Sequence, residues 1–118
     1  MNKINVVVDV SDTVLDDILT TAFEGGSNYW LDSVTIKDKP DTPHKNLYNS
    51  EIVSRGGTLM CYNEDELEGK LLTKKRLLNA IEWYIKDNGG DLDFLEDHDA
   101  QDSDTILQYA LFGDVIYG

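Results

Sequence analysis

Cysteine, proline, histidine and long apolar runs are all scarce in this chain of 118 residues. The one cysteine, Cys61, cannot form a disulfide within the chain, which is typical of proteins kept in a reducing cytosol. No apolar run approaches the roughly 18 residues that cross a bilayer. Near the start, the apolar run Val6–Val8 is short and is followed by Asp9, which does not fit a signal peptide. We therefore expect a cytoplasmic protein that does not bind membranes.

Positive charge is also scarce, because ten Lys and Arg face 23 Asp and Glu and leave a net charge of −13. Such a surface repels nucleic acid, so we expect no DNA binding. Nine of the acidic residues lie between Asp87 and Gly118, where there is no Lys or Arg, and seven of these fall within Asp91–Asp104. This excess of carboxylates is typical either of a merely soluble acidic protein or of one that imitates DNA phosphates.

Apolar residues make up 41% of the chain and recur along its whole length, which favours one folded domain spanning residues 1–118. The periodicity and the turn residues predict these elements in order: a strand at Ile4–Val10, a helix from Ser11 or Thr13 to Gly25-Gly26, strands at Trp30–Lys37, Thr58–Tyr62 and Leu67–Leu72, a helix from Thr73 to about Asp87, a helix at Thr105–Leu111 and a strand at Asp114–Gly118. We predict an α+β fold with a largely antiparallel sheet, two main helices and a short C-terminal helix.

Residues that could perform catalysis or bind a metal do not form a recognisable pattern. His44 and His98 lie in different polar loops, without a nucleophile at a suitable spacing, and favour solvated surface positions. Cys61 lies in a strand pattern that favours a place in the core. The acidic segment beginning at Asn88 lacks the glycine and glutamate positions of a calcium-binding loop. We therefore expect no catalytic residue, no metal and no cofactor.

The segment Phe23–Trp30 joins two glycines to two large aromatic residues. Gly25 and Gly26 leave backbone N–H groups uncovered, so a phosphate could approach them closely. Asn28, Tyr29 and Trp30 follow, with flat faces for a base and polar groups to orient it. The segment therefore predicts part of a nucleotide pocket. The structural alternative is a helix end followed by aromatic residues of the core.

A second glycine pair follows an arginine at Arg55-Gly56-Gly57. Arg55 and Arg76 are the two arginines of the chain, and a guanidinium beside free backbone amides suits a pyrophosphate or a ribose phosphate. The alternative is a surface arginine at a bulge or hairpin turn.

Three ordered blocks carry a resemblance to a known family: Phe23–Trp30, Ser54–Leu59 and Ile106–Gly118. Together they resemble a widespread family of small phage and prophage proteins, whose best-known members are the first type of Thoeris anti-defence proteins. The likeness extends from Asn5 to Gly118, nearly the whole chain.

The resemblance implies a sponge that acts in the cytoplasm of the infected bacterial host. Such proteins bind cyclic ADP-ribose isomers made by TIR-domain enzymes and do not cleave them. Members form homo-oligomers with pockets at subunit contacts, and some also hold cyclic di- or trinucleotides. Arg55 then becomes the first phosphate or ribose contact. The family's second helix supplies an aromatic pocket residue, but here it begins Arg76-Leu77-Leu78-Asn79. Leu77 and Asn79 are pocket candidates, and the open choices for the stacking ring are Trp83, Tyr84 and Tyr109.

Two other functions compete with this hypothesis. An acidic DNA mimic or other inhibitor of a host defence enzyme would use the carboxylates of Asp91–Asp104 and bind a basic protein with strong salt dependence. A nucleotide hydrolase would consume the captured ligand instead of releasing it unchanged.

Overall fold

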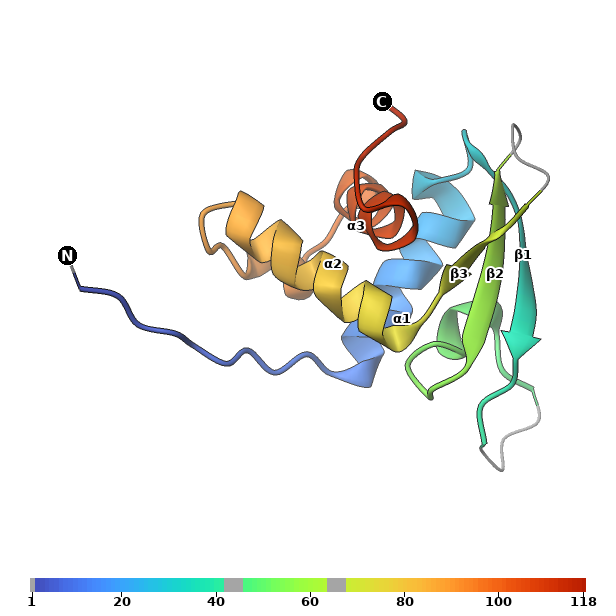
Figure 1. Ribbon diagram of the computed structural model, residues 1–118, viewed down its shortest axis with the longest axis horizontal. Helices are drawn as coiled ribbons and strands as arrows, with labels where there is room; N and C mark the ends of the chain where they lie inside the picture. Colours follow the sequence, from blue (N-terminus) through green and yellow to red (C-terminus); the bar gives the residue numbers. More distant parts are fainter. Residues whose placement is uncertain (1, 42–45, 64–67) are drawn as a thin grey trace.

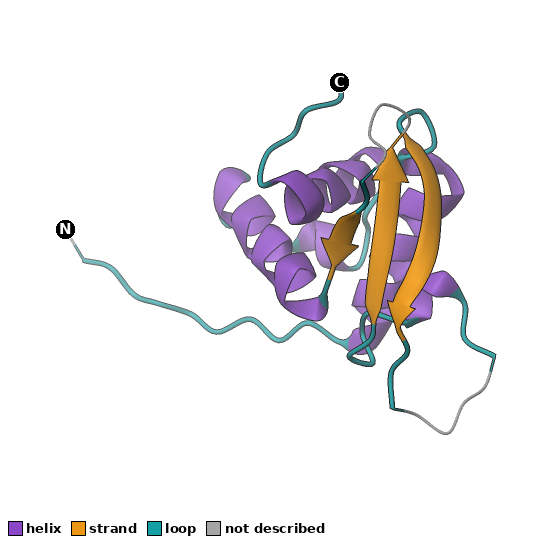
Figure 2. Ribbon diagram, turned by 45° about the vertical axis from the view of Figure 1, so that its right-hand side comes forward, coloured by secondary structure: helices purple, strands orange, loops and turns teal. Residues whose placement is uncertain are grey.

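In the computed structural model, residues 2–41, 46–63 and 68–118 are described, and they form three helices packed against one face of a small sheet (Figures 1 and 2). The elements in chain order are α1 (Asp12–Thr21), a π-helical turn (Ala22–Gly26), β1 (Leu31–Asp38), a 3-10 turn (Asn49–Glu51), β2 (Thr58–Asn63), β3 (Lys70–Leu72), α2 (Lys74–Asp87), a second 3-10 turn (Asp93–Leu95) and α3 (Ala100–Phe112). The predicted α+β class with an antiparallel sheet is confirmed.

The sheet has the order β1-β2-β3, and both neighbouring pairs are antiparallel. Burial alternates along β2, where Leu59 and Cys61 are buried against the helices and their neighbours Thr58, Met60 and Tyr62 are partly exposed. Val34 and Ile36 of β1 pair with these two residues and therefore belong to the same inward row. The sheet thus has one covered face and one outer face, and β1 forms an edge.

Each helix begins at a polar side chain that accepts a hydrogen bond from its first turn. Ser11, one of the two predicted caps, begins α1, and Thr73 caps α2 as the sequence predicts. Asp99 caps α3 through a reciprocal pair of bonds with Asp102, so this helix begins at Ala100, five residues before the predicted start at Thr105. At 13 residues, α3 is nearly as long as the 14-residue α2 and is not a short helix. It ends where expected, because Gly113 adopts the left-handed conformation (φ 70°).

Two predicted strands do not form. Residues 2–10 are extended but unpaired, and they run away from the domain as an arm (Figure 1). Residues 114–118 form an irregular tail that folds back along α3 instead of joining the sheet. The β-branched composition of both segments fits an extended backbone, but a strand also needs a partner edge.

The core lies between the sheet and the helices. Its fully or almost fully buried members come from the three helices, from β2 and β3, and from the segments just before β1 and β2: Leu15, Ile18, Leu19, Trp30, Ile52, Val53, Leu59, Cys61, Leu72, Leu77, Ile81, Ile106 and Leu107. The apolar C-terminal stretch that begins at Ile106 therefore packs largely inward, and α3 contacts both α1 and α2. Among the described helices, none has the length and apolar character needed to cross a membrane. His44 and Leu67, which the sequence places in a loop and at a strand start, lie outside the described residues.

Candidate functional site

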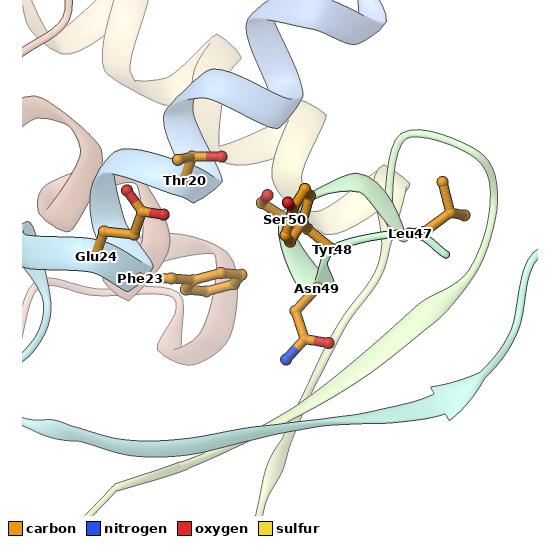
Figure 3. Close-up of a pocket in the computed structure, with 7 residues that line it drawn as sticks. All are labelled: Thr20, Phe23, Glu24, Leu47, Tyr48, Asn49 and Ser50. Atoms are coloured by element: carbon orange, nitrogen blue, oxygen red, sulfur yellow. The ribbon is translucent and has the colours of Figure 1, made fainter. Parts of the chain in front are cut away.

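A depression of about 640 Å³ opens between the end of α1 and the segment before β2. Figure 3 shows Phe23 and Glu24 on one side of it and Tyr48, Asn49 and Ser50 on the other, with β1 passing nearby. Phe23 is partly buried against the core, whereas Tyr48 is 79% exposed. The depression therefore offers two aromatic rings, one packed against the core and one largely exposed, together with hydroxyl, amide and carboxylate groups.

Arg55 lies close to this depression but does not line it. Its guanidinium donates to the carbonyl oxygen of Glu51 (2.9 Å) and lies 3.5 Å from the Asp16 carboxylate and 3.7 Å from the Glu51 carboxylate. Asp16 is one helical turn before Thr20, which does line the depression, and Glu51 directly follows Ser50. The Arg55 side chain is 31% exposed and is therefore partly shielded from solvent.

The turn after Arg55 is shaped by its two glycines. Gly56 has a φ of 90°, which L side chains rarely adopt, and a Cβ at Gly57 would lie 2.8 Å from the carbonyl oxygen of Asp38. Lys74, at the start of α2, donates to the Ser54 carbonyl oxygen (2.9 Å) and also pairs with the Asp12 carboxylate (3.2 Å). The positive charge of this region is thus matched by carboxylates.

The Gly25-Gly26 pair ends α1 through the π-helical turn, and the two glycines differ in their surroundings. A Cβ at Gly26 would collide with the carbonyl oxygen of Ala100 at the start of α3, whereas one at Gly25 would meet nothing within 4 Å. Asn28 is exposed and its backbone N–H donates to the Gly25 carbonyl oxygen (3.3 Å). Gly26 therefore serves close packing, and Gly25 and Asn28 face solvent.

A buried carboxylate organises the aromatic part of the Phe23–Trp30 segment. Asp104 of α3 accepts hydrogen bonds from Ser27 Oγ (2.8 Å), Tyr29 Oη (2.6 Å), Trp30 Nε1 (2.7 Å) and Gln108 Nε2 (3.1 Å). These donors together satisfy both oxygens of a residue that is only 8% exposed.

Gln108 extends the same network to the C-terminal tail. Its Oε1 accepts from the backbone N–H groups of Ile116 (2.9 Å) and Tyr117 (2.8 Å), while its Nε2 donates to the Tyr117 carbonyl oxygen (3.1 Å). The segments Phe23–Trp30 and Ile106–Gly118 are therefore joined through one network, which Asp104 and Gln108 link.

Two tyrosines have strongly raised pKa values. Burial, followed by the hydrogen bond to Asp104 and the charge of that carboxylate, raises the pKa of Tyr29 to about 12. Burial and the hydrogen bond to Asp102 raise the pKa of Tyr84 even further. Both phenols therefore stay protonated and donate hydrogen bonds to carboxylates, which keeps their hydroxyl groups engaged within the fold.

The remaining candidate residues are spread over the molecule. Trp30 is 3% exposed, and its ring stacks on Tyr117 with centroids 5.2 Å apart. Tyr109 stacks on Trp83 at 4.1 Å. Leu77 is fully buried, whereas Asn79 is exposed on α2. The structure thus brings Arg55 to the middle of α1, one turn from the depression, but does not bring these residues to the depression.

Sequence reasoning missed Tyr48, Asn49, Asp104 and Gln108. Tyr48 follows a polar loop whose path no local pattern predicts. Asp104 was counted with the acidic segment, although Asp104, Leu107 and Leu111 lie on one face once the helix is extended to Ala100. A carboxylate aligned with buried leucines was the available signal.

Other reactive groups lie apart from the depression. Cys61 is 2% exposed, and burial raises the pKa of its thiol to about 12, so the thiol stays protonated. His98 is half-buried, and its Nδ1 lies 3.2 Å from the Phe94 carbonyl oxygen instead of being freely solvated. Within residues 2–41, 46–63 and 68–118, no three metal-ligating side chains converge.

Comparisons of the chain with protein-family models, with curated proteins and with solved structures found no match.

Proposed function

We propose that this protein is a phage anti-defence sponge, which binds cyclic ADP-ribose signals made by TIR-domain enzymes in the infected cell and holds them without cleavage. The observation that carries the proposal is the aromatic depression beside Arg55. Cyclic ADP-ribose needs both features, because its base requires a flat surface to stack on and its pyrophosphate requires a cation.

The dimensions and lining of the depression support a nucleotide. Its volume of about 640 Å³ falls within the range of about 300–1,000 Å³ that is usual for small-molecule sites. Phe23 and Tyr48 can stack on a purine from opposite sides, a contact worth roughly 1–3 kcal/mol per base. Thr20, Asn49 and Ser50 add hydroxyl and amide groups that can hydrogen-bond to base edges and ribose hydroxyls.

The contacts of the Arg55 guanidinium allow its carboxylate partners to be replaced by an anionic ligand. The bond to the Glu51 carbonyl oxygen is short, whereas the two carboxylate contacts of 3.5 and 3.7 Å exceed the roughly 2.7–2.9 Å of a strong charge-assisted hydrogen bond. A pyrophosphate with two negative charges can therefore replace the carboxylates while the carbonyl keeps the guanidinium in place. Asp16 and Glu51 oppose an anion, so the neutral Asp16→Asn variant should bind the ligand more tightly.

The test is calorimetric titration with a panel of cyclic ADP-ribose isomers, followed by heating and chromatography of the released ligand. We expect Arg55→Ala to weaken binding by roughly tenfold or more, equivalent to about 1.4 kcal/mol or more. Asp16→Asn should strengthen binding. Arg76→Ala is the matched control, because the second arginine donates to the carbonyl oxygen of Leu71 in β3 and should leave affinity unchanged.

Each result has a clear meaning. Ligand recovered unchanged after heating is the result expected of a sponge, and steady loss of ligand would indicate a hydrolase. Affinity unchanged in Arg55→Ala, or no binding of any isomer, would overturn the proposed site. Cyclic di- and trinucleotides belong in the same panel, because they share the purine and phosphate chemistry.

The second candidate, an acidic protein-binding inhibitor, is favoured by the carboxylates that remain exposed before α3. Asp91, Asp93, Glu96 and Asp97 are exposed, with no neighbouring cation in this stretch. However, Asp99, Asp102 and Asp104 cap α3 or bind buried donors, so less of the acidic segment is available than its sequence indicates. Strongly salt-dependent binding to a basic protein, without uptake of nucleotides, would favour this function.

A further inference from the structure

Among the described residues, the most exposed aliphatic side chains lie on the N-terminal arm, residues 2–10. Ile4, Val6 and Val7 are 86%, 72% and 90% exposed. The arm is extended, and Figures 1 and 2 both show it leaving the domain on the side away from β1. Apolar β-branched residues on an extended, unpaired backbone are typical of a strand that lacks its partner.

The arm also has the alternation of a strand with one covered face. Ile4, Val6, Val8 and Val10 fall on one side, and Asn5, Val7 and Asp9 fall on the other. In a sheet, the first row would lie under a covering layer and the second would mostly face water. The β-branched composition of Ile4–Val10 predicts a strand, and this alternation agrees with it, but the isolated chain leaves the strand unpaired.

An edge of suitable length is present at β1. This strand pairs only with β2 within the described residues, and its eight residues match the length of the arm. Ile36 belongs to the inward row but is 37% exposed because no strand lies beyond it. Asn49 donates to the Val34 carbonyl oxygen (3.3 Å), so one acceptor of this edge is already used, and an added strand would displace the Asn49 side chain there.

Charge favours this contact between two copies of the chain. Each copy carries a net charge of −13, so most surfaces of one copy repel those of another. Residues 3–10 have a net charge of zero, from Lys3 and Asp9, and β1 has −1, from Asp32, Lys37 and Asp38. The arm and this edge are therefore surfaces on which two copies can meet with little repulsion.

We propose that the arm of one copy adds to the free edge of β1 in a second copy as a fourth strand, so that two chains exchange arms. Ile4, Val6 and Val8 would continue the inward row of Val34 and Ile36. Because the arm and β1 lie on opposite sides of one domain, exchange with a second copy needs no reversal of the arm (Figure 1). This assembly goes beyond the proposed function and holds whichever ligand the depression takes.

The first test measures the mass of the full-length protein in solution by light scattering after size-exclusion chromatography. We expect twice the 13.3 kDa mass of the chain, and a single chain mass after deletion of residues 2–8. A cooperative thermal transition in the deletion variant checks that it folds, because these residues contribute no fully buried side chain. A full-length monomer, or a deletion variant that remains a dimer, would overturn the proposal.

Neighbouring substitutions provide a matched pair. Val6→Asp places a charge in the inward row and should abolish the dimer, whereas Val7→Asp places the same charge on the outer face and should preserve it. Equal effects of the two variants would indicate unspecific apolar association and would contradict strand pairing.

Cross-linking separates exchange between copies from folding back within one copy. Val7→Cys and Thr35→Cys, made in separate chains, would both face outward and should form a covalent dimer when mixed under oxidising conditions. The native Cys61 is buried and remains unreactive. A disulfide within the double variant, without the mixed dimer, would show pairing within one chain and refute the exchange.

Discussion

Replacing Asp104 by alanine should destabilise the protein more than any other single change in its acidic segment. Asp104 accepts from four side chains, and the donors Ser27 and Trp30 are almost inaccessible to solvent. Alanine removes the acceptor but leaves these donors buried. The variant therefore loses the free energy of the hydrogen bonds, and its buried donors keep their desolvation cost without a new acceptor.

The magnitude follows from the number of buried donors. A hydrogen bond to a charged group contributes about 1.5–3 kcal/mol, and a buried donor left unpaired costs about 1–3 kcal/mol. Counting only Ser27 and Trp30 as fully affected, we expect a loss of roughly 3–6 kcal/mol in the free energy of unfolding. This is a large part of the roughly 5–15 kcal/mol that is typical of a domain. Asp104→Asn keeps one acceptor oxygen, so its effect should be smaller.

The assay is urea unfolding, followed by the fluorescence of Trp30 and Trp83 and by circular dichroism. Asp97→Ala is the matched control, because Asp97 is an exposed carboxylate of the same segment and should change stability by less than about 0.5 kcal/mol. If Asp104→Ala lost less than about 1 kcal/mol, the network would not join these segments as argued.

Two further predictions concern the tyrosines and the glycine pair. Because the pKa of Tyr29 is raised from 10.0 to about 12, the unfolded phenol ionises first, so this contribution to stability is complete below pH 10 and is lost as pH rises toward 12. Ultraviolet titration of phenolate should show late ionisation of Tyr29 and Tyr84, and Tyr29→Phe should remove one late group; titration of every tyrosine near pH 10 would contradict the hydrogen bonds. Gly26→Ala should destabilise the fold by about 1–3 kcal/mol, because the new Cβ would collide with Ala100. Gly25→Ala should be tolerated, because a Cβ there meets nothing within 4 Å. Thermal melts in which Gly25→Ala were the less stable variant would refute this packing.

The elements that the sequence predicted correctly have local signals. Ser11 and Thr73 cap their helices, Gly113 ends α3, and the alternation in β2 matches its burial. The failures lie where structure depends on a distant partner. Residues 4–10 have the composition of a strand, but pairing needs an edge that a local pattern cannot supply. The start of α3 was placed too late because Asp99 and Asp102 were interpreted only as charge.

The candidate site was predictable in part for the same reason. Arg55 and its glycines form a local motif, and in the structure Arg55 binds Glu51, which directly follows a residue of the depression. Trp30 and Leu77 could not be assigned to core or pocket from sequence, because both roles use the same residue types. Tyr48 reaches the depression only through the path of the chain before β2, which no spacing in the sequence specifies.

The most direct test of the central claim is nuclear magnetic resonance of the labelled protein during titration with a cyclic ADP-ribose isomer. The account predicts that the largest chemical-shift changes fall on Thr20–Glu24, Leu47–Ser50 and the side chain of Arg55, with the ligand intact at the end. Absence of changes at these residues, or changes centred on Asp91–Asp99, would contradict it.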